Sequence, residues 1–427
     1  MPTASNARAT SIRPARRRLT LPPTAAFAGT AVAYAGLYLA AGAPSPLFVQ
    51  YQQAWGFPAG LLTVAFAAYA FGLVAAILVA GSLSDFVGRR PVLIGSLAVE
   101  LAAMIMFLFA PNIGWVIAAR VVQGLATGAA TSAFSASLLE LAPAKARSLS
   151  AIIGGAAPAG GLGLGALLAG VAVQFSTAAS VVVFASLAVI MVLGGFVAVF
   201  AKETVSRQSG ALRSLQPRVR IPAAARREFA AAIPVLLAAW MLAALFIGLA
   251  PTIVHDIFHI DSGLVEGATV FIEPGVAAVT GFVLGRLTSR STIVVGGIGV
   301  FVGTAVIVAG IAFQLLPLIW LGGVIGGVGF GASFSGTLRI VGPFAAPHQR
   351  AELFAAVFLV AYLSFGIPAI ILGQLVAPLG LLTTVIGFGA VTLVAAFVGI
   401  LVQLRQSSRT ARARRARSSL EQASFPA

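Results

Sequence analysis

Four polar side chains that could carry a proton or bind a charged substrate lie within long apolar stretches of the chain. Arg120 and Gln123 are three residues apart, on one face of a helix, and Glu100 and Glu273 each occupy the middle of another stretch. A charge at the centre of a bilayer costs at least ~2.5–3.5 kcal/mol on insertion scales, so ionisable residues there are usually functional. These four residues are therefore our candidates for proton coupling or substrate binding.

Glu273 is the strongest candidate for a coupling carboxyl. Pro274 and Gly275 follow it, and we expect them to break the helix locally and free carbonyl groups that could coordinate a proton or cation. The alternative is a permanently protonated Glu273 that hydrogen-bonds to a neighbouring helix and serves only packing. For Arg120 the alternative is a side chain that extends to the outer headgroups, where it would be the only cation on that face.

A short polar turn with the sequence GSLSDFVGRR, residues 81–90, separates two apolar runs at 59–80 and 91–110. Each run is long enough to cross a hydrocarbon core of ~30 Å as a helix. The turn therefore lies at a membrane surface.

The residue types of this turn predict a conformational gate. Gly81 allows close backbone approach, Asp85 can accept hydrogen bonds from N–H groups or from an arginine, and Arg89 carries the positive charge typical of a cytoplasmic face. The complete predicted gate consists of Gly81, Asp85, Gly88, Arg89, Arg90 and Arg339, the last of which closes a later apolar run.

The composition is that of an integral membrane protein. Hydrophobic residues make up 59% of the chain and charged residues only 9%, which is too little charge for the surface of a soluble domain. Twelve apolar runs are candidate membrane-spanning helices: 24–43, 59–80, 91–110, 113–136, 148–172, 179–200, 230–250, 264–285, 292–313, 317–338, 351–373 and 380–403. We therefore predict an all-α fold.

The basic residues fall on one side of this map. Of the 27 Lys and Arg residues, all except Arg120 and Arg339 lie in the termini or in connections after even-numbered spans. The positive-inside rule then places both termini in the cytoplasm of a multi-pass protein of the cell membrane. The net charge of +16 thus reflects topology, and we expect the arginine-rich tails to contact anionic lipid headgroups rather than nucleic acid. We expect no cleaved signal peptide, because the first apolar run has the length of a span.

The chain is organised as two related halves. The glycine and leucine at 81 and 83 recur at 285 and 287, and Gly124, Gly128 and Arg147 recur 203 positions later. A duplication predicts two parallel six-helix halves with a substrate path between them. The predicted segments are a basic tail at 1–23, a first half at 24–201, a polar linker at 202–228, a second half at 229–404 and a basic tail at 405–427.

Three motifs resemble those of the major facilitator superfamily. The turn at 81–90 is similar to the family's Gly-x-Leu-x-Asp-Arg-x-Gly-Arg-Arg loop, with Phe86 in place of a basic residue. Arg120-Val-Val-Gln123-Gly resembles the family's Arg-x-x-Gln-Gly motif in the fourth span. The fifth span, with Gly154, Pro158 and Gly161, is a loose copy of the glycine and proline motif of proton-coupled antiporters, or else only a helix-packing seam.

The resemblance implies a fold of twelve transmembrane helices that encloses a central cavity. It implies that spans 1, 4, 7 and 10 line this cavity, which makes Tyr34, Tyr38, Trp240 and Ser333 candidates for substrate contacts. It also places the third span on the outside of its half. We therefore favour a structural role for Glu100 over a coupling role.

The predicted function is secondary active transport by alternating access. Nucleophile, base and metal-ligand types do not cluster, the chain has no cysteine, and no phosphate-binding loop for ATP is present, so we predict neither an enzyme nor a cofactor or metal site. We favour a monomeric, proton-coupled exporter of hydrophobic or amphiphilic small molecules. The alternative is an importer or facilitator of a sugar or organic acid, which would require more hydroxyl and amide groups on the cavity helices.

Overall fold

The computed structural model describes residues 20–217, 219–346 and 349–423. Within these ranges, twelve helical stretches are long and apolar enough to cross a membrane. The twelve-helix fold predicted from the sequence is confirmed.

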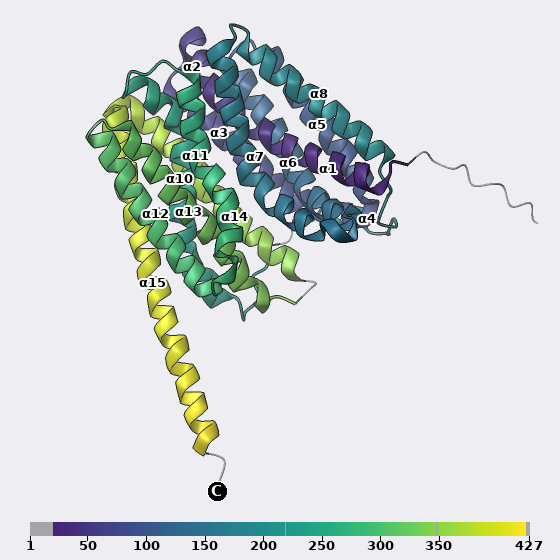
Figure 1. The fold of residues 1–427 in the computed structure, drawn as a ribbon, viewed down its shortest axis with the longest axis vertical. Helices are drawn as coiled ribbons and strands as arrows, with labels where there is room; N and C mark the ends of the chain where they lie inside the picture. Colours follow the sequence, from purple (N-terminus) through teal and green to yellow (C-terminus); the bar gives the residue numbers. More distant parts are fainter. Residues whose placement is uncertain (1–19, 218, 347–348, 424–427) are drawn as a thin grey trace, which may run out of the picture.

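The helices up to residue 200 lie together as a first bundle (Figure 1). Its elements are α1 (Pro23–Gly42), α2 (Pro44–Trp55), α3 (Ala59–Ala80), α4 (Leu83–Val87), α5 (Arg89–Leu108), α6 (Ile113–Leu141), η1 (Ala144–Ala146), α7 (Arg147–Phe175) and α8 (Ala179–Phe200).

A linker with one short helix, α9 (Ala211–Ser214), leads to a second bundle. The second bundle contains α10 (Arg226–Asp256), α11 (Gly263–Val283), η2 (Leu284–Arg286), α12 (Ser289–Ala312), α13 (Leu316–Val341), η3 (Gly342–Phe344), α14 (Arg350–Leu379) and α15 (Leu381–Ala423).

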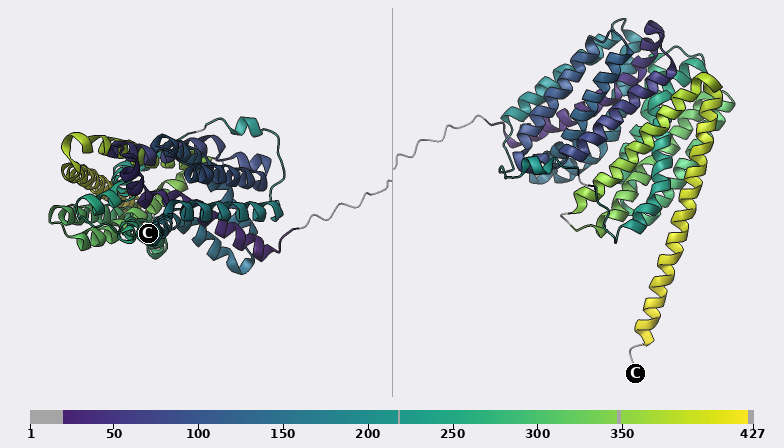
Figure 2. Two further views of the ribbon diagram at one scale, coloured as in Figure 1. Left: turned by 90° about the horizontal axis from the view of Figure 1, so that it is seen from above. Right: turned by 180° about the vertical axis from the view of Figure 1, so that it is seen from behind.

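Two parts of the chain are more helical than we expected. After α1, Ala43 keeps a helical backbone and Pro44 occupies the first position of α2, a position where its missing N–H costs nothing. The first span therefore bends and continues to Trp55 instead of ending in a loop. At the other end, α15 continues to Ala423, far past the predicted start of the tail at 405 (Figures 1 and 2).

The bundles contact each other mainly through two helix pairs, α7 with α11 and α3 with α14, and α2 also contacts α10 and α11. The α7–α11 crossing is close enough to require glycine, because a Cβ at Gly170 would lie 2.2 Å from the carbonyl oxygen of Gly263. This crossing lies near the end of the molecule opposite α4.

Three hydrogen bonds also join the bundles at this end. They are Ser45 Oγ to Ile247 O at 2.8 Å, Gln53 Nε2 with His255 Nε2 at 3.1 Å, and Ser262 Oγ to Gln174 Oε1 at 2.8 Å. The end of the molecule opposite α4 is thus closed.

Candidate functional site: a one-ended cavity and two buried polar centres

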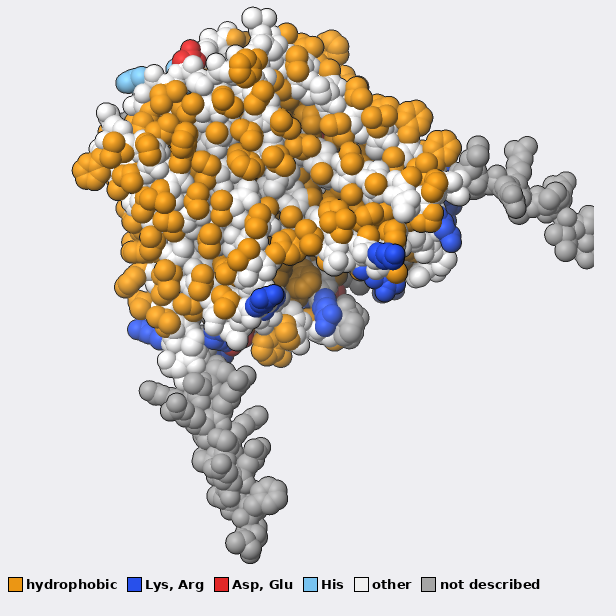
Figure 3. Space-filling model, viewed as in Figure 1, with side chains coloured by type: hydrophobic (Ala, Val, Ile, Leu, Met, Phe, Trp, Pro, Cys, Tyr) orange, Lys and Arg blue, Asp and Glu red, His pale blue; other side chains and the backbone are white. Residues whose placement is uncertain are grey.

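A cavity of about 1020 Å³ lies between the bundles at the end where α4 is found. Side chains of α3, α4, α6, the linker and α14 line it. The Lys and Arg side chains visible in Figure 3 gather at this same end. The two bundles are therefore joined at one end and open at the other.

Arg120 lies inside the first bundle and does not extend to the headgroups. Its guanidinium donates to Gln123 Oε1 at 2.6 Å, to Ala41 O at 2.9 Å and to Ala65 O at 3.3 Å. It also stacks over the ring of Tyr69, 4.3 Å from the ring centroid. Carbonyl dipoles and a π-face together replace the water that a buried cation would lose.

Gln123 connects this cation to Glu100 on α5. Its amide nitrogen donates to Ala40 O at 2.9 Å and to Glu100 Oε1 at 3.1 Å. Glu100 is completely buried, and its second oxygen has no hydrogen-bond partner among the described residues. Arg120, Gln123 and Glu100 thus form one sealed cluster, and none of the three lines the cavity.

Glu273 forms a second and separate buried centre. Its side chain is buried on α11, and neither carboxyl oxygen has a hydrogen-bond partner among the described residues. The packing interpretation requires such a partner on a neighbouring helix. The predicted local break is also not seen, since α11 runs through Pro274 to Val283 as one helix. Proline removes only its own N–H from the helix, which leaves the carbonyl four residues earlier unbonded.

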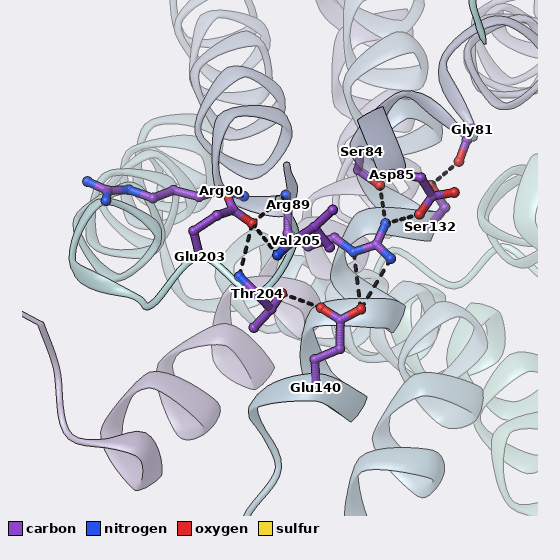
Figure 4. A network of polar contacts seen from close by, with 10 residues as sticks. All are labelled: Gly81, Ser84, Asp85, Arg89, Arg90, Ser132, Glu140, Glu203, Thr204 and Val205. Atoms are coloured by element: carbon purple, nitrogen blue, oxygen red, sulfur yellow. Dashed lines mark hydrogen bonds and ion pairs between the residues drawn. The ribbon is translucent and has the colours of Figure 1, made fainter. Parts of the chain in front are cut away.

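The predicted gate turn is held by an ionic network within the first bundle (Figure 4). Arg89 pairs with Asp85 and donates to Ser84 Oγ at 2.7 Å, and its guanidinium lies 3.2 Å from Glu140 Oε1. Glu140 also accepts a hydrogen bond from the hydroxyl of Thr204. The network therefore joins α4, α5, α6 and the linker.

A second carboxylate, Glu203, caps the start of α5. It accepts the backbone N–H groups of Arg89 at 2.9 Å and Arg90 at 3.0 Å. Gly88, with φ of 102°, provides the positive-φ conformation that turns the chain into the helix. The sequence alone did not predict a role for Glu140 or Glu203. The sequence indicates only that both acidic residues lie at the same membrane surface as the basic turn.

The linker covers the position at which the turn departs from the family motif. The carbonyl of Phe86 accepts the N–H of Gln208 at 2.8 Å, and Ser82 Oγ donates to Ser214 O at 3.4 Å. At Gly81, the carbonyl accepts a hydrogen bond from Ser132 Oγ at 2.7 Å (Figure 4). The ring of Phe86 also lies beside this segment, since a Cβ added at Gly210 would lie 3.6 Å from its Cε1.

Arg339 makes its contacts elsewhere. Its guanidinium donates to Leu287 O at 2.6 Å and lies 3.5 Å from Thr292 Oγ1, and both partners belong to the second bundle. In this conformation Arg339 does not join the turn at 81–90, because the cavity separates the two bundles at this end.

The predicted substrate-contact residues divide into two groups. The hydroxyls of Tyr34 and Tyr38 pair with cavity-lining residues of α6, and Trp240 lies in an aromatic cluster. Ser333, in contrast, faces α12, since a Cβ added at Gly296 would lie 2.5 Å from its hydroxyl oxygen. Ser333 therefore belongs to a helix–helix contact and not to the cavity wall, because glycine on α12 brings that face of α13 into the interior.

The residues of the predicted span-5 motif also differ in their surroundings. Gly161 packs against α1, where an added Cβ would lie 2.7 Å from the Cβ of Tyr38. Pro158 lies inside α7, which continues past it. Gly154 has no atom within 4 Å of an added Cβ, so it does not pack against another helix in this conformation.

Two helical bundles around a central, one-ended cavity are the architecture of a secondary transporter of the membrane. The chain belongs to the Major Facilitator Superfamily, whose family model matches residues 30–366. A search of curated proteins found no match.

Solved structures share this fold at low sequence identity. A POT family transporter in complex with 5-aminolevulinic acid has a TM-score of 0.70 at 13% identity, with 90% of this chain and 96% of that chain covered. The xylose transporter XylE from E. coli has a TM-score of 0.66 at 13% identity, covering 90% and 96%. The human organic anion transporter MFSD10 (TETRAN) has a TM-score of 0.59 at 16% identity, covering 89% and 100%. At these identities the similarity shows the fold alone.

Proposed function

We propose that this protein exports hydrophobic or amphiphilic small molecules across the cell membrane in exchange for protons. The observation that carries the proton-coupling part is Glu273, a buried carboxyl without a hydrogen-bond partner among the described residues. An ionised carboxylate in such surroundings would be very costly, so the group favours the protonated form until it reaches water. That behaviour suits a residue that takes up a proton on one side and releases it on the other.

The cavity supports alternating access as the mechanism. It is open at the end that carries the basic residues and closed at the other, as expected of one of the two states that a rocking transporter visits. By the positive-inside rule the open end faces the cytoplasm, and both termini lie there. The two bundles are then the halves that move, and one chain is sufficient to form the path.

In the proposed cycle, substrate enters the cavity from the cytoplasm and the halves rock to open the outer end. Glu273 then receives a proton from outside, and the return to the present conformation carries that proton inward. The Asp85–Arg89 pair holds the turn in the present state. We propose that this pair rearranges to close the cytoplasmic end in the other state.

Proteoliposomes containing the purified protein test this proposal. An inwardly acidic or outwardly acidic pH gradient is applied, and movement of a fluorescent amphiphile is followed. We expect movement against the proton flux, and we expect Glu273→Gln to abolish its dependence on the gradient while facilitated exchange of substrate persists.

The matched control is Asp261→Asn, which neutralises an exposed carboxylate in the connection before α11. It should transport like the original protein. Gradient-independent uptake of xylose or an organic acid, with no movement of amphiphiles, would instead support the importer or facilitator.

A further inference from the structure

The cavity wall contributed by the first bundle is rich in hydroxyl groups. Thr131 and Ser135, one turn apart on α6, line the cavity. Behind them, the hydroxyl of Tyr38 lies 2.9 Å from Thr131 Oγ1, and that of Tyr34 lies 3.2 Å from Ser135 Oγ. Thr131 Oγ1 donates to Thr127 O at 2.6 Å, so it can only accept a further hydrogen bond, whereas Ser135 Oγ can donate or accept. This wall therefore offers two hydroxyls, held in place by phenols, to an uncharged polar group.

The opposite wall, contributed by the second bundle, is aromatic. Phe358 lines the cavity, and its ring centroid lies 5.6 Å from that of Phe334 and 6.3 Å from that of Tyr362. Both of these rings contact Trp240, at 5.8 Å and 4.8 Å between centroids. Phe358 thus connects the cavity with a cluster of stacked and edge-on rings, a surface that suits a flat aromatic ligand.

The indole N–H of Trp240 has no hydrogen-bond partner among the described residues, although the side chain is only 9% exposed. A buried tryptophan N–H normally finds an acceptor, because leaving this donor unpaired costs free energy. The donor lies behind Phe358 in the aromatic cluster. Its nitrogen has almost no exposed surface and Trp240 is not among the cavity-lining residues, so a ligand reaches it only where the rings of the cluster move apart. A ligand with a carbonyl or similar acceptor would supply the missing partner.

Charge is arranged to disfavour an ionic ligand in the interior of the cavity. Among the described lining residues, the charged ones are Asp85, Arg213 and Glu352, which belong to the turn, the linker and the first turn of α14. Arg120 is buried, and protein acceptors and an aromatic ring already surround it. Arg213, on the linker, is the basic residue among the described lining side chains, and the walls formed by α3, α6 and α14 offer no cation to a carboxylate.

We propose that the cavity binds an uncharged, flat aromatic molecule that carries a carbonyl-type acceptor. Its ring packs on Phe358, its acceptor receives the N–H of Trp240 when the rings of the cluster move apart, and its remaining polar edge faces Thr131 and Ser135. This proposal rests on the proposed transport function, whose substrate class it narrows. It distinguishes the chain from carriers of zwitterions, organic anions or sugars.

Equilibrium binding to the full chain in nanodiscs, with no ion gradient, tests the ligand class. Calorimetric titrations at neutral pH, corrected with empty nanodiscs, compare 2-naphthamide with two ions of the same shape, 2-naphthoate and 2-naphthylmethylammonium. We expect the amide to bind at least about tenfold more tightly than either ion, since each ion must lose its hydration. Equal or tighter binding of the naphthoate, or competition by xylose or dialanine, would overturn the proposal.

Variants test the individual contacts. Trp240→Phe keeps an aromatic ring but removes the donor, so it should weaken 2-naphthamide about tenfold and leave 2-ethylnaphthalene, which has no acceptor, unchanged. Phe358→Leu should weaken both ligands several-fold. Phe313→Leu, at an exposed phenylalanine of the same bundle, is the matched control and should change neither.

The outcomes separate this proposal from the transport proposal. If Phe358→Leu binds both ligands like the original protein, or if Trp240→Phe weakens both equally, the assigned contacts are wrong even when proton-driven transport is intact. If the naphthamide binds as expected but no gradient drives its movement, the coupling proposal fails and the ligand class stands. Phe358→Leu and Thr131→Val provide the test if Trp240→Phe does not fold.

Discussion

The carboxylate of Glu203 accepts the backbone N–H of Arg89 at 2.9 Å, which ties the first residues of the linker to the start of α5. The bond couples two segments that are far apart in sequence. It also means that the linker is part of the gate structure, since Glu203 and Thr204 belong to the same network as Asp85 and Glu140.

Replacing Glu203 with alanine should destabilise this end of the protein. Two N–H groups at the start of α5 would lose their acceptor, a loss of about 1–2 kcal/mol for a helix cap. We expect a lower thermal unfolding midpoint and slower transport. Lys202→Ala, at the exposed neighbouring position, is the control, and equal midpoints for the two variants would contradict the capping role.

Gly88→Ala should be damaging for a related but distinct reason. The backbone at 88 has φ of 102°, and an added Cβ would lie 2.6 Å from Glu203 Oε2. The strain alone is on the order of 1–3 kcal/mol, and the clash would also displace the cap. Gly95→Ala, on the following helix with no atom near an added Cβ, should be neutral or stabilising, as measured by thermal unfolding in detergent.

Gly170→Ala should act on the closed end of the molecule. An added Cβ would lie 2.2 Å from Gly263 O, so α7 and α11 would have to separate there. We expect the population to shift toward the state that is open at this end. Labelling of a cysteine placed at Ser45, which is buried at this end, reports the shift, and the chain has no native cysteine to interfere. Gly154→Ala is the control, and labelling that is no faster in Gly170→Ala would contradict the prediction.

Arg120→Lys should lower stability despite keeping the charge. A lysine cannot reproduce the planar donor set that reaches Ala41, Ala65 and Gln123, nor the stacking on Tyr69. A loss of about 1–3 kcal/mol is expected from buried acceptors left unpaired. The measurement is the unfolding midpoint, with Arg227→Lys at an exposed position as the control. A midpoint unchanged from the original protein would show that the cluster does not depend on the guanidinium.

The sequence was informative where a single helix determines the outcome. Apolar run length located all twelve membrane helices, and the three-residue spacing of Arg120 and Gln123 correctly placed them on one face. The family resemblance was sufficient to identify the fold. These features depend on local periodicity and on motifs within one segment.

The remaining features depend on contacts between segments distant in sequence. The contacts of Glu140 and Glu203 with Arg89 depend on the packing of the turn, α6 and the linker against one another. The orientation of Ser333 depends on how closely Gly296 lets α12 approach α13, which periodicity does not fix. The predicted first span ends at residue 43, whereas a second helix starts at Pro44, because a proline in the first turn lacks only an N–H that has no partner within the helix.

Alternating access between the two bundles is the central claim, and a reversible cross-link at the closed end tests it most directly. The side-chain Nε2 atoms of Gln53 and His255 lie 3.1 Å apart across the bundles, so a short bifunctional methanethiosulfonate that joins Gln53→Cys to His255→Cys would hold this end shut. We predict that this reagent stops transport by the double variant and that reduction restores it, while neither single variant is stopped by it. Transport at the full rate by fully cross-linked protein would contradict the mechanism.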